Sequence, residues 1–258
     1  MAISDLITSL NTGITNIANA IRSKTGSQST IPFATLPSAV NDVYDAGQND
    51  FWDCVQKNGT RVDYEYAFNH WSCEYIRPKY KVIPNNYRSI YLFANNPRLK
   101  KVESQYFDLS NVKSDTSSAT SGHYFTFYRC GNLEEIEDIG MPARYYSGTF
   151  RDCVKLHTIA VLRVTETTAF GTVDNYAFRN CLELQNITIS GTIGTNGLSF
   201  VDCTKLSKAS ITSVISHLSA NASGKSVTFS QTAVENAFTT AEWNTLIGTK
   251  TNWTISLS

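Results

Sequence analysis

The chain has 258 residues, and its 22 Lys and Arg residues balance 22 Asp and Glu residues. This zero net charge argues against nucleic acid or an anionic membrane as the main partner, since both reward an excess of cations. Charged residues make up only 17% of the chain, and 77 Ser, Thr and Asn residues supply much of the polar surface instead. No apolar run approaches the roughly 18 residues that suggest a membrane span, so no membrane insertion is expected.

The N-terminal segment, residues 1–26, carries a heptad pattern of apolar residues. They recur in steps of four and three, as Ile3, Ile7, Leu10, Ile14, Ile17 and Ile21. Ile at the a positions and mostly Ile at d favours three or more helices over two, so the pattern predicts a homotrimeric coiled coil for oligomerisation or attachment. A single amphipathic helix packed on its own domain is the alternative, because three heptads interrupted by Gly13 are marginal. The segment has no basic region and no continuous apolar run, so no secretory signal is expected.

Two segments precede the central part of the chain. Residues 27–58 are expected to form a linker and a second helix, which begins near Pro37. Residues 59–92 are expected to form an aromatic-rich module, since the stretch from Phe51 to Phe93 holds eleven of the thirty aromatic residues. Clustered Tyr and Trp could stack on sugar rings. The favoured interpretation is a small irregular module that uses its aromatic residues as a core.

One short pattern recurs through residues 93–209. It places Phe, Cys and Leu three residues apart, and its members are Phe93, Leu99, Phe127, Cys130, Leu133, Phe150, Cys153, Leu156, Phe178, Cys181, Leu184, Phe200, Cys203 and Leu206. Copies 22 to 34 residues apart are typical of a solenoid, in which each unit buries its apolar face by stacking on the next. We expect the three residues to point inward from a short helical or 3₁₀ turn that precedes a strand. The first copy has Asn96 in place of Cys and is expected to be a cap, because a buried amide needs backbone partners.

The last segment, residues 210–258, is expected to cover the open end of the solenoid with a helix–strand–helix–strand unit. Ile211, Val214, Ile215 and Leu218 share one helical face, and the stretches SVTFS and NWTISL have the composition of strands. Thr239 and Glu242 have the spacing of a capping box and predict the start of the second helix.

Two resemblances emerge from these segments. The stretches FRDCVKLHTI, YAFRNCLELQNITI and FVDCTKL resemble the leucine-rich repeats of the BspA type, over roughly residues 90–209. This resemblance implies a short irregular leucine-rich-repeat solenoid. Together with the segments described above, it gives an expected α+β fold with an N-terminal helix, an aromatic-rich module, the solenoid and an α/β C-terminal cap. The stretches ITNIANAIRSKTGSQSTIPFATLPSAV and FWDCVQKNGTRVDYEYAFNHW are similar to tail, baseplate and fibre-like proteins of phages and prophages of Firmicutes. That similarity implies a virion protein, assembled in the bacterial cytoplasm, which contacts other tail proteins through its N-terminus and a host surface polysaccharide or protein through its repeats.

No pattern predicts an enzyme, a cofactor or a metal site. The sequence contains no C-x-x-C, and its four histidines, His70, His123, His157 and His217, have no partners at ligand or catalytic spacing. The carboxylates Glu134, Glu135, Glu137 and Asp138 are interpreted as a solvated charge run rather than as the facing pair of a glycosidase. Cys54 and Cys73 lie outside the repeat pattern and have no predicted role. The similarity to phage tail, baseplate and fibre-like proteins therefore implies a receptor-binding adhesion protein of a virion, with which the composition, the heptad pattern and the repeats agree. An architectural head-fibre or baseplate-linking subunit, a bacterial surface adhesin and a polysaccharide depolymerase are the alternatives.

Overall fold

The structure is a computed structural model that describes residues 68–71, 73–78, 81–83, 91–110, 112, 125–141 and 145–258. Apart from Pro78, these residues belong to one compact unit, Arg61–Arg77 with Lys81–Ser258. The predicted heptad seam from Ile3 to Ile21, the predicted second helix and Cys54 lie outside the described residues. No helix within the described ranges is long and apolar enough to cross a membrane.

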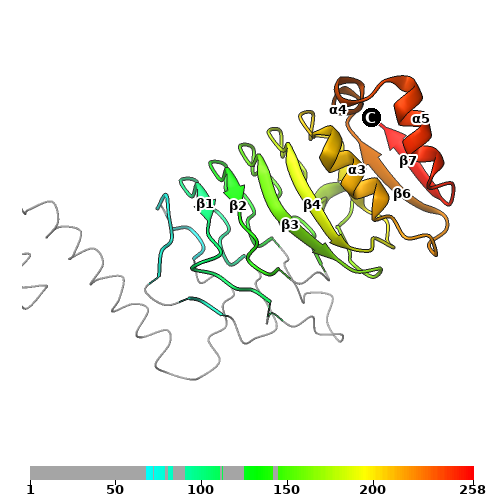
Figure 1. Ribbon diagram of the computed structural model, residues 1–258. Helices are drawn as coiled ribbons and strands as arrows, with labels where there is room; N and C mark the ends of the chain where they lie inside the picture. Colours follow the sequence, from blue (N-terminus) through cyan, green and yellow to red (C-terminus); the bar gives the residue numbers. More distant parts are fainter. Residues whose placement is uncertain are drawn as a thin grey trace, which may run out of the picture. The chain divides into compact units, whose positions relative to one another are not determined.

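Two parallel sheets organise this unit (Figure 1). The first contains four strands in chain order: β1 (Lys101–Val102), β2 (Glu135–Ile136), β3 (Thr158–Val164) and β4 (Asn186–Gly191). The second contains three: β5 (Leu198–Phe200), β6 (Lys225–Phe229) and β7 (Trp253–Leu257). Parallel neighbours require a crossover between strands, and here each crossover is the remainder of one repeat. The mixed α and β content, with parallel sheets built from repeats, agrees with the coarse fold class expected from the sequence.

The register of the first sheet follows the repeat pattern. Lys101 pairs with Glu135, Glu135 with Thr158, and Thr158 with Asn186, and each of these lies two residues after the Leu of its repeat. The next residue in each strand is a buried aliphatic one: Val102, Ile136, Ile159 and Ile187. Successive strand residues alternate between the two faces, so one face of the sheet packs on the core and the other is exposed.

The segment before each strand is a hydrogen-bonded turn, not the predicted helical or 3₁₀ segment. Its i to i+3 hydrogen bonds are present, as in Cys130 N donating to Phe127 O at 3.1 Å. The residue two positions after Phe, however, is left-handed: φ is 56° at Asn95, 58° at Arg129 and 64° at Asp152. A left-handed residue cannot continue a right-handed helix, which is why the spacing of three misled the prediction.

A continuous stack of phenylalanine rings forms the centre of the solenoid, and we call it the Phe ladder. Adjacent ring centroids are 4.7–5.8 Å apart and the interplanar angles are 2–20°. Trp243 packs edge-on against the last ring at 6.1 Å. The ladder extends beyond residues 93–209 at both ends, and its members are Phe68, Phe93, Phe127, Phe150, Phe178, Phe200 and Phe229. All fourteen residues assigned to the repeat core by the sequence are at most 3% exposed.

The cysteines form a second internal ladder. Each buried thiol donates to the carbonyl oxygen of the preceding ladder Phe, for example Cys153 Sγ to Phe127 O at 3.0 Å, and the same contact recurs at Cys130, Cys181 and, at 3.9 Å, Cys203. All five described cysteines are free thiols. Cys73, which had no predicted role, occupies the Leu position of an earlier repeat, because Tyr75 bridges Lys101 at the start of the first strand row.

Asn96 is an internal rung of this ladder and not a cap. Its Nδ2 donates to Phe93 O at 2.7 Å and to Phe68 O, so the amide finds the backbone partners it needs. Phe68 stacks on Phe93 at 5.3 Å, which continues the solenoid past this copy. Asn96 Oδ1, however, is buried without a hydrogen-bond partner, which lowers the stability of this repeat.

The sheet β1–β4 ends where helix α3 (Lys208–Ser216) replaces the next strand. Two hydroxyls of α3 accept hydrogen bonds from the edge of β4: Ser210 Oγ from Ile187 N at 3.0 Å, and Ser213 Oγ from Ile189 N at 3.1 Å. The helix thus satisfies an edge that would otherwise invite pairing with another chain.

The rest of the C-terminal segment follows the predicted order with one addition. Helix α5 (Thr240–Gly248) begins with the predicted capping box of Thr239 and Glu242, which the structure confirms. Helix α4 (Gln231–Ala237), between β6 and α5, was not expected from the sequence. The helix has only seven residues, and its N-cap residue Ser230 makes no side-chain cap hydrogen bond.

Candidate interaction surface

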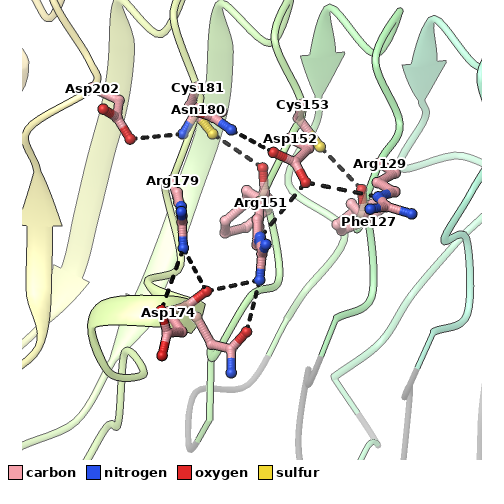
Figure 2. Close-up of polar contacts among 12 residues, drawn as sticks. Phe127, Arg129, Arg151, Asp152, Cys153, Asp174, Arg179, Asn180, Cys181 and Asp202 are labelled. Atoms are coloured by element: carbon pink, nitrogen blue, oxygen red, sulfur yellow. Dashed lines mark hydrogen bonds and ion pairs between the residues drawn. The ribbon is translucent and has the colours of Figure 1, made fainter.

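A row of polar side chains runs along the turns that carry the Phe ladder. We call it the turn-side network, and Figure 2 shows it across successive repeats. Its members lie one or two residues after a ladder Phe or in the neighbouring 3₁₀ helix η2 (Val173–Asn175), and they are Arg129, Arg151, Asp152, Asp174, Asn175, Arg179, Asn180 and Asp202. Because the ladder rings stack about 5 Å apart, the turns that follow them are held at a similar repeat distance.

Two arginines of the network hold η2 in place. Arg151 Nη1 donates to Asp174 O at 2.7 Å and to Asn175 Oδ1 at 2.9 Å. Arg179 Nη1 donates to the same Asp174 carbonyl at 3.0 Å. The planar guanidinium suits this role because it presents several donors in a fixed geometry.

A hydrogen-bonded chain links the second residue after the ladder Phe in three repeats, and two of these residues, Asp152 and Asn180, are left-handed. Asn180 Nδ2 donates to Asp152 Oδ1 at 2.6 Å, and Asn180 N donates to Asp202 Oδ2 at 2.9 Å. Asn and Asp tolerate the left-handed conformation better than most residues, since their short polar side chains bond locally. The same residue types therefore shape the turns and fill the network.

Arg129 is the most exposed of the three arginines of the network. Its side chain is 61% exposed, and Asp152 Oδ2 is 3.9 Å from its Nε. The guanidinium lies 4.9 Å from the centroid of the Tyr128 ring, which Arg151 also approaches, at 5.5 Å. This corner offers an aromatic ring and exposed donors, a combination that suits polar ligands. Three arginines and three aspartates balance across the network, so recognition here depends on hydrogen bonds and stacking more than on net charge.

Charged side chains on the exposed face of the first sheet form ion pairs with one another. Lys101 Nζ is 3.2 Å from Glu135 and 2.7 Å from Glu137, and Arg163 pairs with Asp138. The hydrogen bond from Lys101, with further ones from Ser104 N and Oγ, lowers the pKa of Glu137 to about 2. Arg163 likewise lowers the pKa of Asp138. A glycosidase needs one carboxyl with a raised pKa as its acid, and these two are shifted in the opposite direction.

The other sequence candidates for chemistry are dispersed. His157 Nδ1 lies 2.9 Å from Thr158 Oγ1, and His217 Nδ1 lies 2.7 Å from Ser213 O. His70 occupies a left-handed turn, and His123 lies outside the described residues. Burial raises the pKa of the Cys130 thiol to about 12, so this thiol stays protonated and is a poor nucleophile or metal ligand. In the part of the chain that the structure describes, no three His, Cys, Asp or Glu residues are grouped to hold a metal ion.

The turn-side network was not expected from the sequence, although the repeats carry a signal for it. The stretches FYRC, FRDC, FRNC and FVDC place a polar residue at the second position after each ladder Phe. The backbone at that position is left-handed in most copies. Its side chain therefore does not point where it would in the right-handed helical turn that the spacing of three predicted. The six predicted seam residues of the N-terminal helix lie outside the described residues, so their role in oligomerisation stays a prediction.

The fold and this surface define a class of protein: a repeat solenoid with a polar surface spread over many turns. Residues 64–170 and 120–247 match the model of the BspA type leucine rich repeat region, in 6 copies. The chain belongs to this family of repeat proteins, and such a repeat region is compatible with surface binding or adhesion. No curated protein and no solved structure matches the chain.

Proposed function

We propose that this protein is a non-enzymatic adhesion protein of a phage particle. Residues 1–26 attach it to other proteins of a tail, baseplate or fibre, and the leucine-rich repeats bind a polysaccharide or protein on the host cell surface. The observation that carries the binding role is the turn-side network, which spreads hydrogen-bonding side chains over consecutive repeats held by the Phe ladder. Its hydrogen bonds fix the side chains before a ligand arrives, which lowers the entropy lost on binding.

The virion setting has a separate support. Residues 14–40 and 51–71 are similar to segments of phage and prophage tail, baseplate and fibre-like proteins. The heptad seam adds a means of assembly, because three copies on one particle would raise weak single-site affinity by about 10²–10⁴-fold through avidity. A charge-balanced surface suits this arrangement, since each copy then contributes a modest affinity.

Two experiments test the proposal. Immunogold labelling of intact particles should place the protein on a tail or surface appendage; absence from particles contradicts the virion setting. Light scattering should give the mass of a trimer for the full chain and of a monomer for the full chain with Ile14→Asp, because a charge at an a position disrupts the seam. A monomeric wild-type chain contradicts the trimer.

The alternatives give different results in the same assays. An architectural subunit is labelled on particles but does not bind host cells. A bacterial surface adhesin is found on bacteria and not on particles. A depolymerase releases reducing sugar from cell-surface polysaccharide, which an adhesion protein does not.

A further inference from the structure

An open pocket of about 400 Å³ lies on the repeats, and none of its lining residues belongs to the turn-side network. It is lined by Glu134, Lys155, His157, Glu183 and Gln185. Glu134, His157 and Gln185 directly follow the Leu of three consecutive repeats, and Lys155 and Glu183 lie two residues after the Cys of two repeats. The same backbone repetition positions them, since His157 N donates to Glu134 O at 2.9 Å and Gln185 N to His157 O at 3.1 Å. Pockets of about 300–1,000 Å³ are the usual size of small-molecule sites.

The charges of this pocket are incompletely paired. Glu183 forms an ion pair with Lys205 Nζ at 2.6 Å. Lys100 interacts electrostatically with Glu134, but it forms an ion pair with Glu74 at 2.9 Å. Across the described residues, neither the Glu134 carboxylate nor the Lys155 ammonium has a hydrogen bond or ion pair with another side chain. The pocket therefore presents one unpaired anion and one unpaired cation, from neighbouring repeats, to the same space.

We infer that this pocket binds a zwitterionic sugar unit, one that carries both an ammonium group and a carboxylate. Glu134 receives the ammonium, and Lys155 receives the carboxylate. His157 keeps Nε2 for a ligand hydroxyl, since its Nδ1 contacts Thr158 Oγ1 at 2.9 Å, and Gln185 supplies an amide. The inference names a ligand class for the adhesion proposed above and rests on that proposal for its biological setting.

Other ligands of similar size satisfy the pocket less completely. A neutral sugar offers the two charges no charged partner, and hydrogen bonds in which both donor and acceptor are ionised are stronger than those to a neutral group. A sugar with only an ammonium leaves Lys155 without a charged partner, and a sugar with only a carboxylate leaves Glu134 without one. Selectivity for the ligand with both groups is therefore the distinguishing property of the site.

The test measures binding of three probes to the full chain by NMR or calorimetric titration. Muramic acid carries both groups, N-acetylmuramic acid lacks the ammonium, and glucosamine lacks the carboxylate. Muramic acid should bind about 3- to 5-fold more tightly than either, the range expected for one solvent-exposed ion pair. With four histidines in the chain, the ring resonances of His157 give a local reporter of occupancy.

Two variants separate the two contacts. Glu134→Gln should abolish the preference for muramic acid over N-acetylmuramic acid, and Lys155→Gln should abolish the preference over glucosamine. Both side chains are exposed, so folding should be unchanged, and Glu235→Gln and Lys225→Gln serve as matched controls outside the pocket.

Equal affinity for the three probes, no binding, or preferences that survive both substitutions would overturn the inference. Cell binding by the full chain, measured in parallel, separates its failure from failure of the proposed function. A chain that adheres to cells but ignores muramic acid rejects the pocket and leaves adhesion in place. A chain that selects muramic acid but does not adhere to cells rejects the adhesion role while leaving the ligand site.

Discussion

Truncation of a central ring of the Phe ladder should destabilise the repeats more than any surface change. Phe178 is 1% exposed, and its ring centroid is 5.3 Å from that of Phe150 and 4.7 Å from that of Phe200. Phe178→Ala removes both stacked contacts and leaves a cavity between two rigid neighbours, which should cost about 3–5 kcal/mol of the free energy of unfolding. Phe178→Leu keeps most of the apolar volume and loses the two stacked pairs, worth about 0.5–1.5 kcal/mol each, so it should cost about 1–3 kcal/mol.

The assay is urea unfolding followed by circular dichroism, with the midpoint and the slope of the transition both recorded. Phe238→Ala is the control, because Phe238 is only half-buried and its ring lies tilted, 5.7 Å from that of Trp243. If Phe178→Ala costs no more than this control, the ladder is not the stabilising centre. If Phe178→Leu is nearly neutral, apolar volume alone and not ring stacking explains the effect.

Four further variants test single contacts. Asn96→Cys should raise the free energy of unfolding by about 1 kcal/mol in urea, because it removes a buried unpaired oxygen; a loss of stability contradicts this reasoning. Burial raises the pKa of Cys130 from 9.0 to about 12, so its contribution to stability is present below pH 9 and is lost as the pH rises toward 12. Cys130→Ala should weaken that alkaline decline, and an unchanged pH profile argues against the shift. The pKa of Glu137 is lowered from 4.5 to about 2, so its contribution to the free energy of unfolding is present above pH 4.5 and lost as the pH falls to 2. Glu137→Gln should therefore make the free energy of unfolding depend less on pH between 4.5 and 2. Arg151→Lys should cost about 1–2 kcal/mol, since an ammonium cannot reproduce the two hydrogen bonds to η2, and a neutral effect shows that they contribute nothing net.

Much of the repeat architecture could be predicted from local spacing. The Phe-x-x-Cys-x-x-Leu pattern indicated the stacking unit because each member must be buried against the next copy. The capping box of Thr239 and Glu242 was equally readable, since its two hydrogen bonds depend on residues only three apart. Both features are decided by a few neighbouring residues.

Other features depended on contacts that spacing does not reveal. Phe68 and Phe229 lie on the Phe ladder without the Cys and Leu that marked the other copies, so only the stacking identifies them. The turn geometry was mispredicted because right-handed helices and left-handed turns can share a spacing of three. Glu134 looked like one member of a charge run, yet the structure separates it from Glu137, which is held by Lys101. Partners on other repeats decide which charges are paired.

The proposed function requires the repeat surface to bind a host-surface polymer without cleaving it. The most direct measurement is binding of the labelled full chain to intact cells of a panel of Firmicutes, with released reducing sugar assayed in the same samples. We expect saturable binding that is reduced severalfold by Arg129→Gln and unchanged by Lys225→Gln, with no reducing sugar released. Absence of saturable binding across the panel, or release of reducing sugar by the wild-type chain, would contradict the proposed non-enzymatic adhesion role.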